Sequence, residues 1–388
     1  MVWHAIWHWL DTTLVMAWQI AWSLILGFAL SAVIESLVPK SRIAGLLPDD
    51  RPRTLVTATG LGAVASSCSY AATALARSLF RKGANFTAAI AFQIASTNLV
   101  IELGIVLALI IGWPFTLAEF VGGPIMIAVV ALLIRRLLTP KLIDAARRQA
   151  ERGLAGSMEG HAAMDMSVPV ERGVLRTLVS ARGSTAVSET FVMEWASIIR
   201  DLGLGLLVAG AASAWIPNAF WSHLFLADHP LLAKAWGPII GPAVAVATSV
   251  CSIGNVTLAA VLWNGGISFG GVTAFLFADL VILPIVVIYR KYYGTAVALR
   301  LSALLYLASV VAGYVVELLF EALRLVPTGA RHAQDGQTGV HWNYTSVLDI
   351  VFGVLAVALV YRFFAVGDGP MLRQMNGSPE GAQHEHAE

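Results

Sequence analysis

The sequence predicts an all-α integral membrane protein. We expect two inverted repeats, each with three transmembrane helices and a re-entrant helical hairpin, and an additional C-terminal transmembrane helix. Apolar residues make up 57% of the 388 residues, charged residues make up 13%, and the mean hydropathy is +0.74. Soluble domains are about 45–50% apolar and about 25% charged. The composition therefore excludes a soluble enzyme, a disordered protein and a nucleic-acid binder. An internal repeat predicts the duplicated halves, and the placement of basic residues predicts that the halves are inverted.

Seven stretches are long and apolar enough to cross a bilayer, since about 20 helical residues span the hydrocarbon core. No basic residue precedes Lys40, so the chain lacks the charged start of a cleavable signal peptide, and we expect the first helix to be retained. The predicted spans are 12–36, 85–112, 114–138, 193–216, 267–289, 301–323 and 345–366.

Two further apolar stretches, 54–82 and 237–265, are interrupted by polar residues. The first interruption lies at Ser66–Tyr70 and the second at Thr248–Asn255. Each arm has about 12 residues, which at 1.5 Å per residue reaches only the middle of a bilayer. Each stretch is therefore predicted to enter and leave on the same side of the membrane.

The two interrupted stretches also resemble each other. At an offset of 183 residues, segments 68–95 and 251–278 align without a gap and are identical at ten of 28 positions. The matched pairs include Cys68/Cys251, Ser69/Ser252, Gly83/Gly266 and Phe92/Phe275. Duplicated halves with the substrate site between them are typical of transporters.

Basic residues set the orientation, because Lys and Arg concentrate on the cytoplasmic side of membrane proteins. With both interrupted stretches as hairpins and the N-terminus outside, 21 basic residues face the cytoplasm and three face outward, Arg200 being set aside within a span. If all nine stretches cross, the division is 14 to 10. The hairpin arrangement gives three crossings per half, and an odd number predicts that the halves are inverted.

The chain divides into five predicted parts. Residues 1–138 form the first repeat, 139–190 a polar cytoplasmic linker, 191–325 the second repeat, 326–366 an outer loop with the last transmembrane helix, and 367–388 a disordered tail. The linker holds Met158, His161, Met164 and Met166. These residues suit a soft metal ion, but they also fit a flexible linker, and the sequence leaves the choice open.

A half-helix is expected to begin just after each cysteine, so that free N–H groups and the positive end of the helix dipole point to the membrane centre. Such a place suits an anion or a polarisable group, and a thiolate there binds soft species. The predicted substrate-binding residues are Ser67, Cys68, Ser69, Asn98, Ser249, Cys251, Ser252 and Asn255. The alternative for each cysteine is a small buried space-filling residue.

Ionisable residues inside spans are costly and are usually functional. Glu102 lies in the middle of a predicted span, four residues after Asn98 and therefore on the same helix face, and Asp279 occupies the repeat position of Ser96. We expect Glu102 and Asp279 to bind a proton or a coupling ion, or else to form interhelical hydrogen bonds. Glu119, Glu317 and Glu321 lie nearer to span ends and stay ambiguous. Pro284 is expected to kink its helix.

These features favour a secondary permease for a small soft or anionic solute, without a cofactor and without enzymatic activity. No phosphate-binding G-x-x-x-x-G-K-[S/T] motif is present, so a gradient or a separate subunit would supply the energy. The expected partners are the substrate and the lipid bilayer, with a homo-oligomer left open. Two alternatives are a transmembrane thiol–disulfide electron carrier using Cys68 and Cys251, and a passive channel.

The sequence resembles the predicted-permease family that includes ArsP-type organoarsenical efflux permeases and YraQ-like permeases. The resemblance covers roughly 20–325 and is carried by Ser67-Cys68-Ser69, the Gly83 turn, Ala95-Ser96-Thr97-Asn98 and the second-half repeat from Ser249 to Asp279. The chain departs from the family pattern at Tyr70-Ala71, where a Gly and a following Pro are expected. The resemblance implies a multi-pass permease of the bacterial inner membrane, and its ArsP members imply export of thiol-seeking trivalent organoarsenicals.

Overall fold

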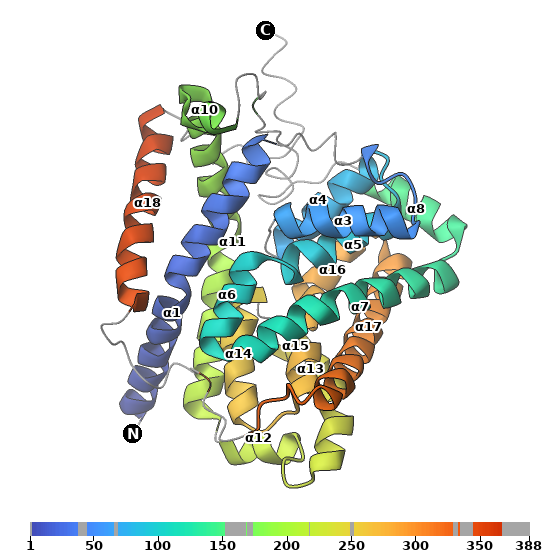
Figure 1. Ribbon diagram of the computed structural model, residues 1–388, viewed down its shortest axis with the longest axis vertical. Helices are drawn as coiled ribbons and strands as arrows, with labels where there is room; N and C mark the ends of the chain where they lie inside the picture. Colours follow the sequence, from blue (N-terminus) through green and yellow to red (C-terminus); the bar gives the residue numbers. More distant parts are fainter. Residues whose placement is uncertain are drawn as a thin grey trace.

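The computed structural model describes residues 2–37, 45–65, 69–151, 168, 174–216, 218–248, 252–328, 333 and 344–366, and the regular elements among them are all helices. In Figure 1 the long helices α1 (Val2–Leu37) and α11 (Ala181–Trp215) run side by side, and α18 (Tyr344–Val366) packs against both at the edge of the molecule. The remaining helices form a more compact body beside this layer.

Five helical segments among the described residues are long and apolar enough to cross a membrane, and a bent pair makes six. The five are α7 (Trp113–Leu137), α13 (Pro230–Thr248), the segment Phe269–Tyr293, α17 (Thr295–Ala322) and Ser346–Val366 in α18. Helices α1 and α11, with 36 and 35 residues, also have the length of a span. The chain is therefore a multi-pass membrane protein.

Each interrupted stretch folds as two helices. The first stretch gives α3 (Pro52–Ala65) and α4 (Ser69–Arg81), and the second gives α13 and α14 (Ser252–Asn264). Both α4 and α14 begin directly after a cysteine and have 13 residues, as the repeat predicts. The prediction of arms of about 12 residues is wrong for α13, which begins at Pro230, has 19 residues and is long enough to cross a membrane.

Glycines at matched positions end the two hairpins. Gly83 and Gly266 have φ values of 106° and 108°, a left-handed conformation that favours glycine. Asn85 and Ser268 then cap the following helices, α5 (Phe86–Asn98) and α15 (Phe269–Phe277), with side chains that accept from backbone N–H groups. The same local chemistry therefore starts the same element in each half.

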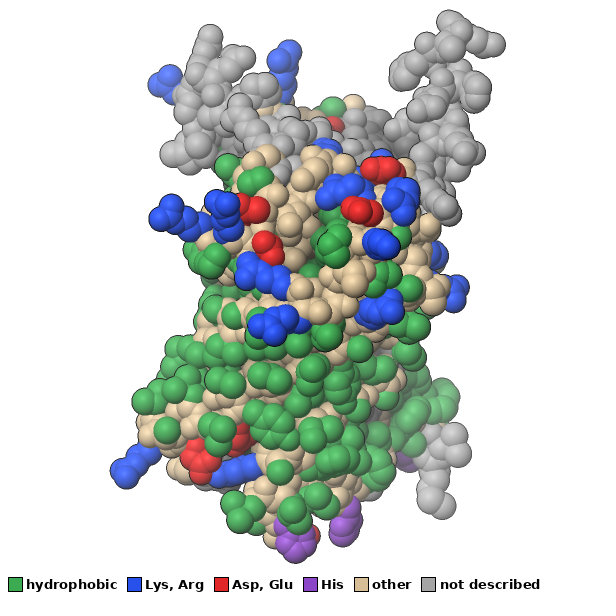
Figure 2. All heavy atoms as spheres, turned by 90° about the vertical axis from the view of Figure 1, so that its right-hand side faces the viewer, with side chains coloured by type: hydrophobic (Ala, Val, Ile, Leu, Met, Phe, Trp, Pro, Cys, Tyr) green, Lys and Arg blue, Asp and Glu red, His purple; other side chains and the backbone are tan. Residues whose placement is uncertain are grey.

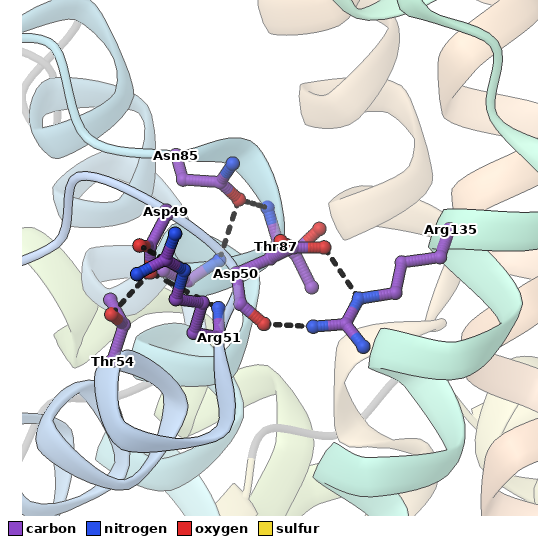
Figure 3. A network of polar contacts seen from close by, with 8 residues as sticks. Asp49, Asp50, Arg51, Thr54, Asn85, Thr87 and Arg135 are labelled. Carbon is purple, nitrogen blue, oxygen red and sulfur yellow. Dashed lines mark hydrogen bonds and ion pairs between the residues drawn. The ribbon is translucent and has the colours of Figure 1, made fainter.

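A polar network fixes the open end of the first hairpin (Figure 3). The Asn85 N–H donates to the Leu47 carbonyl oxygen at 2.7 Å, so the two ends of the hairpin lie together. Arg135, near the end of α7, binds the carboxylate and the carbonyl oxygen of Asp50. Hydrogen bonds from the Thr54 hydroxyl and the Arg51 N–H hold the pKa of exposed Asp49 below its ordinary value.

The predicted spans 85–112 and 267–289 each contain a break: the segment Phe269–Tyr293 still has the length and composition of a span, and the first forms one only as a bent pair of helices. α5 ends at Asn98, and α6 (Ile101–Ile110) continues at an angle of 40°. In the second half α15 passes into the 3₁₀ turn η1 (Ala278–Leu280), and α16 (Leu283–Tyr293) begins one residue before Pro284. The proline that we expected to kink its helix therefore lies at a helix start, where proline is well tolerated.

Part of the predicted linker is ordered helix. α8 (Pro140–Ala150) buries Ala146 and Ala150, α10 (Val174–Val179) follows, and α11 begins at Ala181 instead of 193. Arg147 of α8 donates to carbonyl oxygens at the end of α4, and Arg77 of α4 donates to the Ala150 carbonyl oxygen at 2.9 Å. α8 is thus held against the open end of the first hairpin. The Met/His segment and the C-terminal tail lie outside the described residues.

Figure 2 shows where charge and apolar surface lie. Lys and Arg gather toward the upper end, where the first hairpin opens in Figure 1, and a broad hydrophobic band lies below them. The second hairpin opens at the lower end, where α12 (Asn218–Leu224) lies beside the start of α13. A Cβ built on Gly266 would be 2.8 Å from that of Ala227, which places the end of α14 beside the loop that leads into α13.

Small residues let the hairpin arms approach the broken helices closely. A Cβ on Gly62 of α3 would lie 2.4 Å from the Phe92 carbonyl oxygen of α5, and one on Gly241 of α13 would lie 2.4 Å from the Gly271 carbonyl oxygen of α15. Close backbone approach of this kind is the usual means of helix association in membranes. Each half therefore packs a hairpin arm on its broken helix.

We predict that Gly241→Val destabilises the bundle by about 1–3 kcal/mol, because the added methyl groups collide with backbone that cannot move independently. Gly353→Val is the matched control, since nothing lies within 4 Å of a Cβ at Gly353 in α18. Thermal unfolding of the detergent-purified chain, followed by fluorescence-detected gel filtration, measures both. Equal melting temperatures for the two variants would contradict the close packing of α13 on α15.

Candidate functional site

The first hairpin touches the break of the second half at the side chain of Asp279. Ser69, the first residue of α4, donates its hydroxyl hydrogen bond to the Asp279 carboxylate at 2.7 Å, and both residues are fully buried. Asp279 lies in η1, 210 residues further along the chain. The start of α4, where we predicted an anion site, therefore already faces a carboxylate of the protein itself, an arrangement favoured by the helix dipole.

A second buried polar link lies one turn further along α4. The Gln93 amide nitrogen of α5 donates to the Thr73 hydroxyl and to the Tyr289 hydroxyl, each at 2.8 Å. Thr73 in turn donates to the Ser69 carbonyl oxygen at 2.7 Å. This network connects α4, α5 and α16, so the predicted site is braced by elements from both halves.

Two predicted ligands are buried without hydrogen bonds. Neither polar atom of the Asn98 or Asn255 amide has a hydrogen-bond partner among the described residues, and the side chains are 1% and 0% exposed. Asn98 ends α5 at its break, and Asn255 lies in the first turn of α14. Buried amides normally find partners, so such pairs of free donors and acceptors are typical of places where water or a ligand binds.

Glu102 is placed differently from our expectation. It lies in the first turn of α6, whereas Asn98 is the last residue of α5, so the break separates them and the expected shared helix face is wrong. Glu102 is 7% exposed, and Asp279 is fully buried. The two predicted coupling residues thus belong to the breaks of different halves.

Four predicted ligands, Ser67, Cys68, Ser249 and Cys251, lie outside the described residues. The start of α14 at Ser252 is described, but its side chain is not. The predicted pairing of both cysteines at one site therefore stays a prediction. Within the described part of the chain no group of three or more His, Cys, Asp or Glu residues could hold a metal ion.

Glu119 of α7 was ambiguous in the sequence, and the structure places it inside the bundle. It is fully buried. In the sequence, its position near the start of a span suggested that the side chain reaches the membrane surface. The packing of α7 shows instead that the side chain is buried. Of the other two ambiguous residues, Glu317 accepts from the Gly270 N–H at the start of α15, and exposed Glu321 pairs with Lys234.

We predict that Ser69→Ala lowers the stability of the chain by about 1.5–3 kcal/mol, because it removes a hydrogen bond to a buried charged group. Thr257→Ala is the control: Thr257 is also buried, but its hydroxyl donates within its own helix, to the Gly254 carbonyl oxygen. Thermal unfolding of both variants tests the link. A Ser69→Ala protein as stable as Thr257→Ala would show that the contact with Asp279 contributes nothing.

Comparisons with known proteins agree with the resemblance found in the sequence. The chain is 63% identical over 350 residues to "Putative permease Rv2963" of Mycobacterium tuberculosis, an alignment that covers 90% of this chain and 86% of that protein. No solved structure matches. Both the relative and the family point to a transporter and give no support to the alternative of an electron carrier. Residues 5–318 match the ArsP_1 family of predicted permeases, and the chain belongs to this family.

Proposed function

We propose that this chain is a secondary permease of the bacterial inner membrane, with two inverted halves and a central site between them. The hydrogen bond between Ser69 and Asp279 carries the proposal, because it joins the hairpin tip of one half to the helix break of the other deep in the bundle. Sites of this kind, between repeats and lined by discontinuous helices, are where secondary transporters bind their substrates. Irregular backbone at this depth is tolerated where protein or an aqueous cavity covers it.

The opposite placement of the hairpins supports the inversion. The first hairpin opens where basic residues gather, and the second opens at the other end (Figures 1 and 2). By the positive-inside rule the basic end is cytoplasmic, so the N-terminus lies outside. We propose that the first repeat spans 1–138 and the second 191–325. One half would rock against the other to expose the site alternately.

The proposed cargo is a small soft or anionic solute. The chemistry at the site consists of the thiols of Cys68 and Cys251, the hydroxyls of Ser67, Ser69, Ser249 and Ser252, and the amides of Asn98 and Asn255. Thiolates bind soft, thiophilic species, and hydroxyls, amides and helix N-termini bind oxyanions. A trivalent organoarsenical combines a soft centre with hydroxyl groups and matches the efflux implied for ArsP-type permeases. Asp279 and Glu102 are the proposed coupling residues.

We predict that Cys68→Ser and Cys251→Ser each reduce transport of a trivalent methylarsenical at least about tenfold, which corresponds to about 1.4 kcal/mol. Serine keeps the size and a hydrogen-bonding group but lacks the soft sulfur. Uptake into everted membrane vesicles is the measurement, and Thr257→Ala is the control for expression and folding.

Transport at the parent rate in both cysteine variants would contradict the ligand role. If the parent does not move the probe, the substrate belongs to another class, and growth of a deletion strain against metalloids, metals and sulfur compounds identifies it. A flux that does not depend on any ion gradient would favour the passive channel.

We predict that Arg51→Cys and Lys82→Cys, both exposed, label from the cytoplasmic side only, and that Asp228→Cys labels from outside. The background is the chain with Cys68→Ser and Cys251→Ser. A membrane-impermeant maleimide added to whole cells and to lysed cells makes the comparison. Labelling of positions 51 and 82 from opposite sides would mean that the first hairpin crosses the membrane, and the inverted arrangement would fail with it.

A further inference from the structure

Glu119 is a buried carboxylate without a hydrogen-bond donor. Its side chain is 0% exposed, and neither carboxylate oxygen accepts a hydrogen bond from any described residue. No Lys or Arg in the described part of the chain forms an ion pair with it. An ionised carboxylate in this state is very costly, and carboxylates retained in such places in membrane proteins usually serve a function.

The neighbours of α7 place Glu119 beside both helix breaks. One turn beyond Glu119, a Cβ on Gly122 would be 2.7 Å from the Phe277 ring at the end of α15, and one on Gly123 would be 2.5 Å from Leu99, which follows Asn98. α7 therefore runs between the break of the first half and the break of the second. The Asn98 amide, with its unbonded oxygen and nitrogen, belongs to the same region.

Asp279 is the acidic residue at the helix break of the second half, beside which α7 places Glu119. The other acidic residues on helices packed against α7 are Glu102 of α6, Glu317 of α17 and Glu321 of α17. Glu317 is held by the Gly270 N–H and Glu321 by Lys234. The basic residue of α17, Arg300, is exposed. The α17 tyrosines Tyr306 and Tyr314 donate hydrogen bonds to carbonyl oxygens of α13. The buried Tyr289 hydroxyl of α16 accepts a hydrogen bond from Gln93. Asp279 lies two residues after Phe277, whose ring packs at Gly122 one turn beyond Glu119.

We propose that Glu119 and Asp279 form a two-carboxylate site that binds and releases the coupling proton of the permease. Two carboxylates close together in a low-dielectric interior cannot readily both be ionised, so they share a proton and titrate as a pair. The Ser69 hydroxyl holds Asp279 by a hydrogen bond, which leaves Glu119 as the member without a competing donor. This inference rests on the proposed transport function and adds Glu119 to the proposed coupling residues Asp279 and Glu102.

Infrared difference spectroscopy of the full chain in lipid nanodiscs, between acidic and alkaline buffer, tests the site without any substrate. We expect a carbonyl band of a buried protonated carboxyl that Glu119→Gln abolishes. Glutamine has the shape of the protonated carboxyl and keeps the fold. Glu317→Gln is the matched control and should keep the band, because Glu317 is a buried acidic residue of α17 that accepts from the Gly270 N–H. Asp279→Asn should change the pH at which the band appears, since it removes the partner.

A band that survives in Glu119→Gln, or a parent chain without such a band, would overturn the proposal. In vesicles, Glu119→Gln should exchange substrate across the membrane but lose all acceleration by a pH gradient. If the parent transports none of the tested solutes, the proposed function fails while the spectroscopic result stands by itself. If transport proceeds and the pH gradient still drives it in Glu119→Gln, the proton site fails while the permease function stands.

Discussion

The buried carboxylate of Asp279 is the constraint on which the centre of this bundle depends. A charged group so far from water needs a donor and an electrostatic environment that tolerates it. Ser69 supplies the donor, and the start of α4 supplies the positive end of a helix dipole. These two requirements can be met only if α4 begins at the depth of η1 and its N-terminus points at Asp279. The break of one half therefore fixes how deep the hairpin of the other half reaches.

Close packing and helix-end contacts hold the parts that surround this junction. Glycines on α3 and α13 bring each hairpin arm against its broken helix. At the end where basic residues gather, Arg77 and Arg147 bind carbonyl oxygens at the ends of each other's helices, where cations are favoured. The guanidinium of Arg147 also lies 4.0 Å from the centre of the Phe80 ring. The hairpin is therefore fixed at its open end by α7 and α8, while its tip meets the site.

The sequence predicted those features that leave a local chemical signal. The starts of α4 and α14 follow the Cys-Ser pairs, and the turns at Gly83 and Gly266 need a residue that adopts positive φ. The break at Leu99 and Val100 was not predicted, because two apolar residues carry no turn signal inside an apolar span. Nor could α8 be recognised, since its polar composition is that of a linker and its alanines become buried only against the bundle.

The site was predictable to the extent that the repeat revealed it. Asp279 and Asn98 were found because polar residues inside spans are rare, and both lie at the breaks. Glu119 carries the same signal, but its distance from the start of α7 is equally typical of a residue that reaches the membrane surface. Glu119 is buried because α7 packs against the breaks of α5 and α15. No local sequence pattern predicts a tertiary contact of this kind.

The position of Asp279 gives a physical reason for proton and solute to be coupled. The positive start of α4 faces a carboxylate, so an anionic or electron-rich solute arriving there competes with that negative charge. A proton shared by Glu119 and Asp279 leaves one negative charge where the ionised pair has two, so it weakens this competition at the helix end. Binding of the proton then favours binding of the solute, and the converse holds by linkage, with the same free energy. In the proposed mechanism, the pair of Glu119 and Asp279 thus couples binding of the proton to binding of the solute. The hairpin of the first half takes part through the hydrogen bond of Ser69 to Asp279.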